Sequence, residues 1–551
     1  YIATKMRAIG YQGITTNSTY DAWTPSRAYS HYHGGVRILS ETASCKLATP
    51  ITVKFDQLRP GEGYDPRKEA PNFGPVWQGG EWHIGDITRY MTTAAFSLLH
   101  NAADEREKWL TRFYEIGKEA VRPRKDGELF GFVVPPLTNN KILFVERILG
   151  EAGVEMQEVR RFTLARRSYP DNSMIIRVAQ PYGLFAKAIF ENQKYPDLKD
   201  GNGNPIPPYD VTAHTVSLLA GVDIDPLYSP LNVNVKPIKT ILGLSDSSVG
   251  CLAKSYLVQV YRSEIPAIDE GWTRWVLKNE KLDRHPFIYD CDLLAYSGLR
   301  SAAIRANQIK AVTQSGSNEI RPGTIIFPDQ SPNQILNGYA KGTMPDEYTG
   351  GVGKEGVENL KKFVEAGGTL VFLNRASDFA IEQFGLPVKD VTQGLARKDF
   401  YIPGSILRTE LDTTSPIAKG MPAESIAWFE NGPVFEVAGS PPCLGAVASE
   451  ASPGGSSTEN LMLINYHPTA KAVPLLNREG SPCVRAIARY PTDPAKILLS
   501  GWALGAEKIA GKAALVGVTY GKGKIILFGF RPQYRGQSLA TFPLFFNAIS
   551  N

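Results

Sequence analysis

The stretch HYHGGVRILSE, residues 31–41, contains the residue types best able to do chemistry. His31 and His33 stand two apart, so on a strand both imidazoles would share one face, where such a pair can bind zinc. None of the seven histidines begins an HxxE or HxxxH pair, so a third ligand would have to come from far along the chain. Polar histidines at the entrance of a strand are therefore the favoured interpretation.

Glu41 directly follows the apolar run at residues 36–40, which is typical of a strand. Open α/β enzymes place their chemistry at the ends of strands. A partly desolvated carboxylate at such a position can take up and release a proton. The spacing makes Glu41 a candidate general base, with a solvated or salt-bridged glutamate as the alternative.

The composition is that of a globular protein of about two to four domains, with 551 residues and 43% hydrophobic content. Lys and Arg number 60 against 55 for Asp and Glu, so nothing indicates a nucleic-acid or anionic membrane partner. No apolar run reaches the roughly 18 residues that span a membrane. The five cysteines include no CxxC pair, which argues against a thiolate zinc site, while Cys443 and Cys483 could pair.

Alternating strand and helix patterns dominate the later part of the chain. Helical periodicity is expected over residues 84–121, and a strand, helix and strand over residues 130–159. The alternation returns with an apolar strand at residues 323–329, a helix at 355–368 and the strand TLVFL at 369–373. A further apolar strand at 523–530 and a helix at 538–549 follow near the end of the chain. This order predicts a parallel, doubly wound sheet. We interpret the irregular residues 160–322 and the β-rich residues 395–520 as insertions.

Two glycine-rich motifs do not predict nucleotide binding. Gly351, Gly353 and Gly356 spell G-x-G-x-x-G, but the residues before them read as a loop, whereas the dinucleotide motif needs a strand there. A helix-entry loop is the better interpretation. The sequence YGKGK at residues 520–524 is typical of a hairpin turn.

Several stretches resemble the end of the catalytic domain of carboxypeptidase A-like zinc metallocarboxypeptidases, in particular large bacterial members with a long C-terminal extension. They are YDAWTPSRAYSHYHGGVRILSETAS, WQGGEWHIGDITRYMTTAAFSLL, EKWLTRFYEIGKEAV, RVAQPYGLFAKAIFENQKYPD, PYDVTAHTVSLLAGV and DEGWTRWVL. The resemblance is strong over residues 1–275 and weaker beyond. It implies that Glu41 is the general base and acid acting on a zinc-bound water. It also implies that Tyr20 contacts substrate, with Tyr32, Tyr29 and Arg37 as weaker substrate-binding candidates.

The sequence departs from that family because the HxxE zinc pair and the substrate-carboxylate arginines, which lie upstream of the tyrosine in the family, do not occur here. We expect Zn²⁺ for the family, but we assign no metal ligand in this chain. Tyr1 is not a Met and no signal-peptide core follows it, so we expect that a segment has been removed upstream. Its own N-terminal fragment is accordingly an expected partner, beside a peptide substrate or self-association.

Residues 126–551 resemble the class I glutamine amidotransferase-like fold. Active members carry a cysteine on a tight turn after a central strand. Here TLVFL is followed by Asn374, Arg375, Ala376 and Ser377, with no cysteine, and Ser377 is not expected to act as a nucleophile. This part is expected to support or bind rather than to catalyse.

The sequence therefore predicts an α/β protein. Residues 1–125 would form the C-terminal part of a zinc carboxypeptidase-like domain, and residues 126–551 an amidotransferase-like parallel-sheet domain. The predicted function is removal of C-terminal residues from peptides by a secreted or periplasmic bacterial hydrolase. The alternative is a noncatalytic binding or self-assembling protein derived from such a peptidase.

Overall fold

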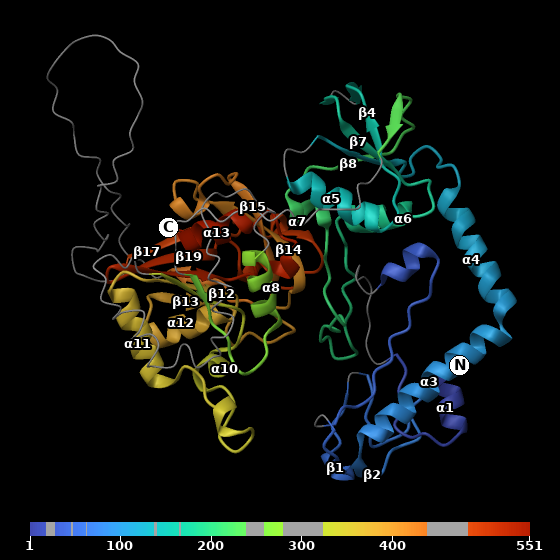
Figure 1. Cartoon of the computed structure of the whole chain (residues 1–551), viewed down its shortest axis with the longest axis horizontal. Coiled ribbons are helices and arrows are strands. Elements are labelled where there is room, and N and C mark those ends of the chain that lie inside the picture. Colours follow the sequence, from blue (N-terminus) through green and yellow to red (C-terminus); the bar gives the residue numbers. More distant parts are fainter. Residues whose placement is uncertain are drawn as a thin grey trace. The chain divides into compact units, whose positions relative to one another are not determined.

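The computed structural model describes residues 1–17, 28–45, 48–61, 63–136, 140–164, 167–238, 258–278, 323–437 and 483–550 (Figure 1). The chain forms two compact units. The first comprises residues 1–244 apart from Leu219–Gly221, together with Ser500–Trp502. The second comprises nearly all of the remainder.

The described elements up to residue 238 alternate between short strands and helices. In chain order they are α1 (Ile2–Ala8), η1 (Tyr29–His33), β1 (Ile51–Lys54), η2 (Phe55–Gln57), β2 (Gly79–Trp82), α3 (Ile84–Asp104), α4 (Arg106–Val121), β3 (Gly131–Val134), α5 (Asn140–Glu151), β4 (Gln157–Val159), β5 (Phe162–Leu164), β6 (Arg167–Tyr169), β7 (Ser173–Arg177), α6 (Gly183–Phe190), α7 (Val216–Ala220), β8 (Asp225–Leu227) and β9 (Val235–Pro237).

The elements from residue 258 onward build the larger sheet. They are β10 (Val258–Val260), α8 (Ile268–Lys278), β11 (Thr324–Phe327), α10 (Pro332–Asn337), η7 (Asp346–Tyr348), α11 (Gly353–Glu365), β12 (Thr369–Leu373), α12 (Ala376–Phe384), β13 (Val388–Asp390), β14 (Pro403–Leu411), η8 (Pro416–Ala418), β15 (Glu424–Glu430), β16 (Phe435–Val437), β17 (Cys483–Arg489), η9 (Pro494–Lys496), β18 (Leu498–Ser500), η10 (Ala506–Lys508), β19 (Ala513–Tyr520), β20 (Gly523–Phe528), η11 (Tyr534–Gly536) and α13 (Phe542–Ser550).

The sheet of the first unit is antiparallel, with strand order β8-β3-β7-β4-β9. The expected strand, helix and strand of residues 130–159 form as β3, α5 and β4. However, β7 lies between the two strands and pairs antiparallel with both. The parallel arrangement that strand–helix alternation predicts is therefore confined to the second unit.

The sheet of the second unit is mixed. Strands β10, β11, β12 and β20 run parallel in that order, and β20, β19, β17, β14 and β15 continue the sheet with antiparallel pairs. The coarse prediction of an α/β fold is confirmed, but the predicted parallel sheet is a mixed one in which only β10, β11, β12 and β20 are parallel. Residues 395–520 are rich in strands, as expected. The predicted hairpin turn joins β19 to β20, where Tyr520 pairs with Gly523.

The core of this unit lies between the parallel strands and their helices. Phe327 of β11 stacks on Phe372 of β12, and α11 packs Leu360 and Phe363 into the same cluster. Side chains alternate between the two sheet faces, and Thr324 on the opposite face donates a hydrogen bond to the carbonyl of Ile549 in α13, 3.0 Å away. Helices thus cover both faces of the parallel strands, as the doubly wound prediction requires.

Two predicted elements differ in the structure. Residues 35–45 form no strand, because the run at 36–40 pairs with no described neighbour and its Val36, Ile38 and Leu39 are exposed by 44–52%. The single helix expected at 84–121 is two helices, since Glu105 leaves helical geometry at φ −103° and ψ 23°. Within the described residues, no helix combines the length and apolarity needed to cross a membrane.

Candidate functional site

Charged and amide side chains follow three neighbouring parallel strands at the point where each ends. Asp329 comes two residues after β11, Asn374 and Arg375 come directly after β12, and Arg531 comes three residues after β20. The carboxyl ends of parallel strands share one edge of a sheet, which is where open α/β proteins bind ligands. The pairing of these strands brings the four side chains together.

Arg531 is the centre of this cluster and is only 7% exposed. Its Nε donates to Asp269 Oδ1 at 2.9 Å, its Nη2 to Asp329 Oδ2 at 2.8 Å and its Nη1 to Glu430 Oε2 at 2.9 Å. The guanidinium also lies over the ring of Trp428, 5.7 Å from its centroid. A planar fork with donors in three directions can satisfy three carboxylates at once, which a lysine cannot do.

The two buried aspartates of the cluster respond differently to it. Burial alone would raise the pKa of Asp329, but hydrogen bonds from Arg375 and the charge of Arg531 outweigh it, so this pKa is lowered. Burial raises the pKa of Asp269 to about 7, because Arg531 offsets only part of the desolvation and Asp329 adds a like charge. Asp269 is therefore the member of the cluster that changes charge near neutral pH.

Asn374 occupies a sharp turn between β12 and α12, with a left-handed φ of 53°. An asparagine tolerates this conformation better than most residues. Its Nδ2 donates to Asp329 Oδ1 at 3.0 Å and to the carbonyl of Glu430 at 3.1 Å. The strand–turn–helix geometry that presents a nucleophile in other proteins therefore carries here a buried asparagine whose amide nitrogen makes two structural hydrogen bonds.

Ser377 is completely buried on the first turn of α12. Its hydroxyl is within hydrogen-bond distance of the carbonyls of Phe372 and Phe528, at 3.3 and 3.0 Å. No base is among its partners. Its hydroxyl is therefore occupied by backbone carbonyls.

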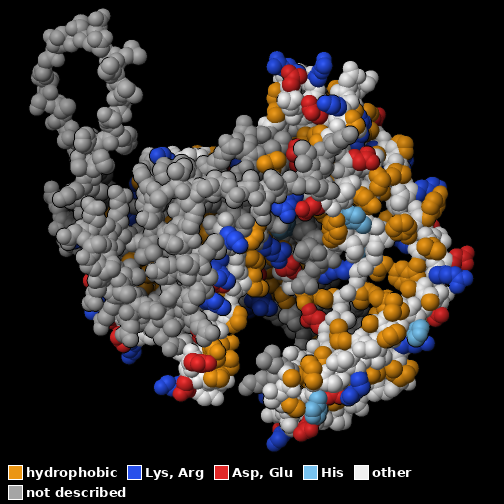
Figure 2. All heavy atoms as spheres, viewed as in Figure 1, with side chains coloured by type: hydrophobic (Ala, Val, Ile, Leu, Met, Phe, Trp, Pro, Cys, Tyr) orange, Lys and Arg blue, Asp and Glu red, His pale blue; other side chains and the backbone are white. Residues whose placement is uncertain are grey.

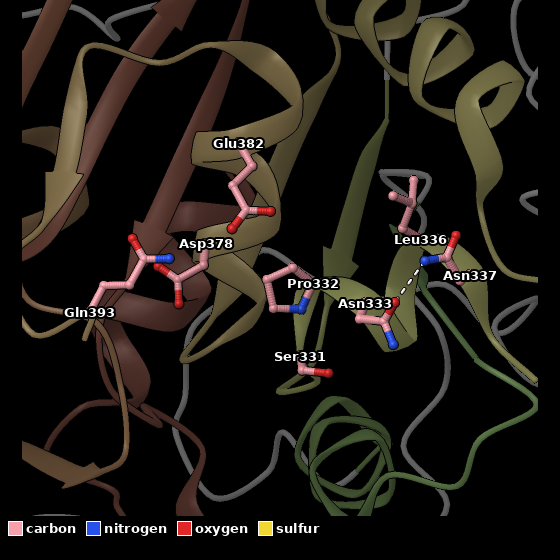
Figure 3. A pocket seen from close by; sticks show the side chains of 8 residues that line it. All are labelled: Ser331, Pro332, Asn333, Leu336, Asn337, Asp378, Glu382 and Gln393. Atoms are coloured by element: carbon pink, nitrogen blue, oxygen red, sulfur yellow. Dashed lines mark hydrogen bonds between the residues drawn. The ribbon is translucent and has the colours of Figure 1, made fainter. Parts of the chain in front are cut away.

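A cavity of about 440 Å³ opens beside the same sheet edge, between α10 and α12 (Figure 3). The α10 side is reached from the end of β11 and the α12 side from the end of β12. Gln393, which follows β13, completes the wall beside Asp378. The lining residues are Ser331, Pro332, Asn333, Leu336, Asn337, Asp378, Glu382 and Gln393.

The walls of this pocket are polar and acidic. Asp378 and Glu382 stand four apart on α12, so they project from the same face of the helix. Burial raises the pKa of Asp378 to about 8, and the charges of Asp390, Glu382 and Asp329 add to the shift, while Arg375 opposes it. None of the eight lining side chains is basic.

His31 and His33 make structural contacts and do not converge on one point. His33 lies between Tyr29 and Tyr182, with ring centroids 4.4 and 4.3 Å away. Its Nε2 contacts the carbonyl of Ala152 at 2.8 Å, and its Nδ1 the carbonyl of Tyr29 at 3.2 Å. The Nε2 of His31 accepts the backbone N–H of Arg37 at 3.2 Å.

Glu41 is exposed, contrary to its expected place at the end of a buried strand, and the hydroxyl of Tyr209 donates to its Oε1. Tyr32 is half-buried in η1 against Phe185, and burial, followed by the charge of Glu191, raises its pKa. Arg37 lies in the irregular segment that follows η1. Tyr20 falls outside the described residues.

The described residues do not form a site that fits the zinc ion implied by the sequence resemblance. Both ring nitrogens of His33 already contact carbonyl oxygens. In the described ranges, no three His, Cys, Asp or Glu side chains are grouped so that they could hold a metal ion.

The sheet-edge cluster and pocket were missed by sequence reasoning, although a signal for them exists. Each apolar strand is followed within three residues by a charged one, in TIIFPD, TLVFLNR and KIILFGFR. A doubly wound sheet brings such residues to one edge. Reading the residues after the predicted strands would have found Asp329, Arg375 and Arg531.

Comparison with known proteins adds little. No family model matches the sequence, and no curated protein matches it. Among solved structures, a ThuA-like protein from Bacteroides uniformis shares 12% identity at a TM-score of 0.25, over 56% of this chain and 96% of the other. A cytoplasmic protein from Salmonella typhimurium shares 11% identity at a TM-score of 0.22, over 44% of this chain and 77% of the other. These similarities are too distant to bear on the fold or the function.

Proposed function

We propose that this chain is a noncatalytic binding protein that takes a small organic cation, carrying ammonium or guanidinium groups, into the pocket between α10 and α12. The observation that carries the proposal is the pair of carboxyl groups of Asp378 and Glu382, which line a cavity without any basic side chain. Neither carboxyl forms a hydrogen bond or ion pair with the described residues. A bound cation would supply the missing partner.

The electrostatics of the pocket favour a cation over a neutral or anionic ligand. In the ligand-free protein, burial and, to a lesser extent, like charges raise the pKa of Asp378 to about 8, so this carboxyl is mostly protonated at neutral pH. A cation close to both carboxyls stabilises their charged forms. Pro332 and Leu336 add apolar surface for an alkyl chain, and Asn333 and Gln393 add hydrogen-bonding groups.

The absence of catalysis is proposed from the turn after β12. The resemblance to amidotransferase-like proteins implies a cysteine there, but Asn374 holds the position and its amide donates to Asp329 and Glu430. The finer description of residues 126–551 as an amidotransferase-like domain is part of this proposal. Secretion or a periplasmic location is supported by Cys483, which is disulfide-bonded.

Calorimetric titration with three ligands of similar length, putrescine, butane-1,4-diol and succinate, distinguishes a cation site from a site for a neutral or anionic ligand. We expect putrescine to bind and the diol and the dianion not to bind. Asp378→Asn should abolish binding, Glu382→Gln should weaken it, and Glu355→Gln on the exposed face of α11 serves as the matched control. Equal binding of putrescine by wild type and Asp378→Asn would refute the assignment of the site.

A second candidate function is hydrolysis of C-terminal peptide bonds by a parent protein, with Glu41 as general base and Tyr20 and Tyr32 beside the substrate. The hydrogen bond from Tyr209 favours it, since it orients the carboxylate of Glu41. Metal ligands would have to come from outside the described residues. Glu41→Gln tests this candidate with a peptide substrate, and an unchanged rate of hydrolysis would exclude a catalytic role for Glu41.

A further inference from the structure

The outer faces of α3 and α4 leave an unusual amount of apolar surface in water. On α4, Leu110, Phe113, Tyr114 and Val121 are 67, 56, 66 and 49% exposed. At 100° per residue they fall within an arc of about 100°, which is one face of the helix. The side of the helix next to this arc packs inward, where Ala120 is buried and Trp109 donates a hydrogen bond to Asn101 Oδ1 at 3.3 Å.

Large apolar side chains are also exposed on α3, which packs against α1. Ile84, Met91, Phe96 and Leu99 are exposed by 39–60%, whereas Ala94 and Ser97 are buried. Figure 2 shows hydrophobic side chains along the part of the surface where Figure 1 draws α3 and α4. We call these eight exposed side chains of α3 and α4 the apolar stripe.

The stripe is too large to be scattered surface hydrophobicity. A fully exposed aromatic side chain offers about 150–250 Å², so Phe96, Phe113 and Tyr114 together leave on the order of 350 Å² uncovered. The five aliphatic side chains extend this patch beyond what soluble monomers usually show. Single exposed apolar residues need no explanation, but a contiguous stripe on an amphipathic helix indicates a binding surface.

We propose that the stripe is a self-association surface, on which α4 packs antiparallel against α4 of a second copy. The charges beside the stripe carry this choice of partner. Glu107 and Lys118 flank the same side of the stripe near opposite ends of α4, and neither forms an ion pair with the described residues. An antiparallel pair places each Glu107 opposite the Lys118 of the other copy.

The apolar residues of α4 are related by nearly the same two-fold axis as Glu107 and Lys118. The midpoint between Glu107 and Lys118 lies between Arg112 and Phe113, and the midpoint between Leu110 and Tyr114 is Arg112. A two-fold axis beside α4 at the level of residues 112–113 therefore places Glu107 opposite Lys118, Leu110 near Tyr114 and Phe113 near its own copy. The centres of these three pairs lie within one residue of each other, so one axis brings all of them together, as an isologous dimer interface requires.

Sedimentation velocity on the full chain over a range of concentrations tests the surface. Wild type should form a dimer, and Leu110→Glu should raise the dissociation constant by at least about tenfold, as expected for a central apolar contact. Leu143→Glu, at a comparably exposed leucine of α5 (46%), is the matched control and should leave the dimer intact. A wild-type protein that stays monomeric at high concentration would overturn the proposal.

A charge swap distinguishes the antiparallel pairing from any other use of the stripe. Glu107→Lys and Lys118→Glu each place like charges opposite one another and should weaken the dimer several-fold at low salt. The double variant restores opposite charges and should recover the wild-type dissociation constant. A double variant weaker than either single variant would refute the antiparallel geometry, and circular dichroism confirms that each variant is folded.

Discussion

Replacing Asp269 with asparagine should change how the stability of the second unit depends on pH. Asp269 is 5% exposed and accepts a hydrogen bond from Arg531 Nε. Its pKa is raised from the ordinary value of 3.8 to about 7, chiefly by burial. The asparagine keeps an acceptor oxygen in the same place but does not titrate.

The expected effect follows from the linkage between protonation and folding. Between pH 4 and 7 the folded state keeps a proton on Asp269 that the unfolded chain has already lost. Stability therefore falls as the pH rises through this window and levels off above it. With the two pKa values above, the free energy of unfolding decreases by roughly 2–3 kcal/mol between pH 5 and pH 8 through this one group.

Urea titrations at pH 5 and pH 8, followed by hydrogen exchange of peptides from β11, β12 and β20, measure this difference in the second unit alone. The change in unfolding free energy between pH 5 and pH 8 should be smaller in Asp269→Asn than in wild type by roughly 2–3 kcal/mol. Other titrating groups such as Asp378 are present in both proteins and cancel from the comparison. Asp399→Asn, at an exposed position, should behave as wild type. A wild-type pH dependence in Asp269→Asn would refute the assigned pKa and its cause.

Five further variants test the sheet-edge cluster and the packing of α11 by urea unfolding of the same unit. Arg531→Met should lower the free energy of unfolding by about 3–5 kcal/mol because it leaves buried carboxylates unpaired. Arg375→Met, at a side chain that is 43% exposed, should lower it clearly less. Equal losses of stability in the two variants would contradict the central role of Arg531. Asn374→Ala should destabilise more than Asn374→Gly, because only glycine adopts the left-handed φ of 53° at no cost. Gly368→Ala should destabilise by about 1–3 kcal/mol through overpacking, since an added Cβ would lie 2.2 Å from the ring of Phe363, and an unchanged midpoint would show that this ring has room to move.

The parallel strands could be predicted because the residues of each strand indicate a buried strand without reference to distant contacts. TIIF and TLVFL are continuous apolar runs bounded by polar residues, which is typical of strands buried on both faces. Helix α11 was equally readable, since Val357, Leu360 and Val364 recur at helical spacing and all three are buried.

The errors have physical causes that a sequence does not display. The run before Glu41 is as apolar as a strand, but strand formation depends on a neighbour that supplies hydrogen bonds, and the described residues offer none there. The break at Glu105 carries no glycine or proline. β7 separates β3 from β4 through contacts that are distant in sequence, so the local alternation could not reveal an antiparallel sheet.

The pocket was only partly predictable from the sequence. The spacing of Asp378 and Glu382 places both on one face of a helix, and that much is visible in the sequence. The wall that Ser331 and Asn333 supply comes from the end of a different strand. Only the order of β11 and β12 in the sheet brings the two walls together.

The most direct test of the binding proposal is the number of protons released when putrescine binds, measured by calorimetry at pH 7 in buffers of different ionisation heat. Asp378 is mostly protonated in the free protein at this pH, because its pKa is about 8. A cation in the pocket should therefore release most of one proton, and its affinity should rise between pH 6 and pH 8. Binding without proton release, or affinity that falls over this range, would contradict a cation held by Asp378 and Glu382.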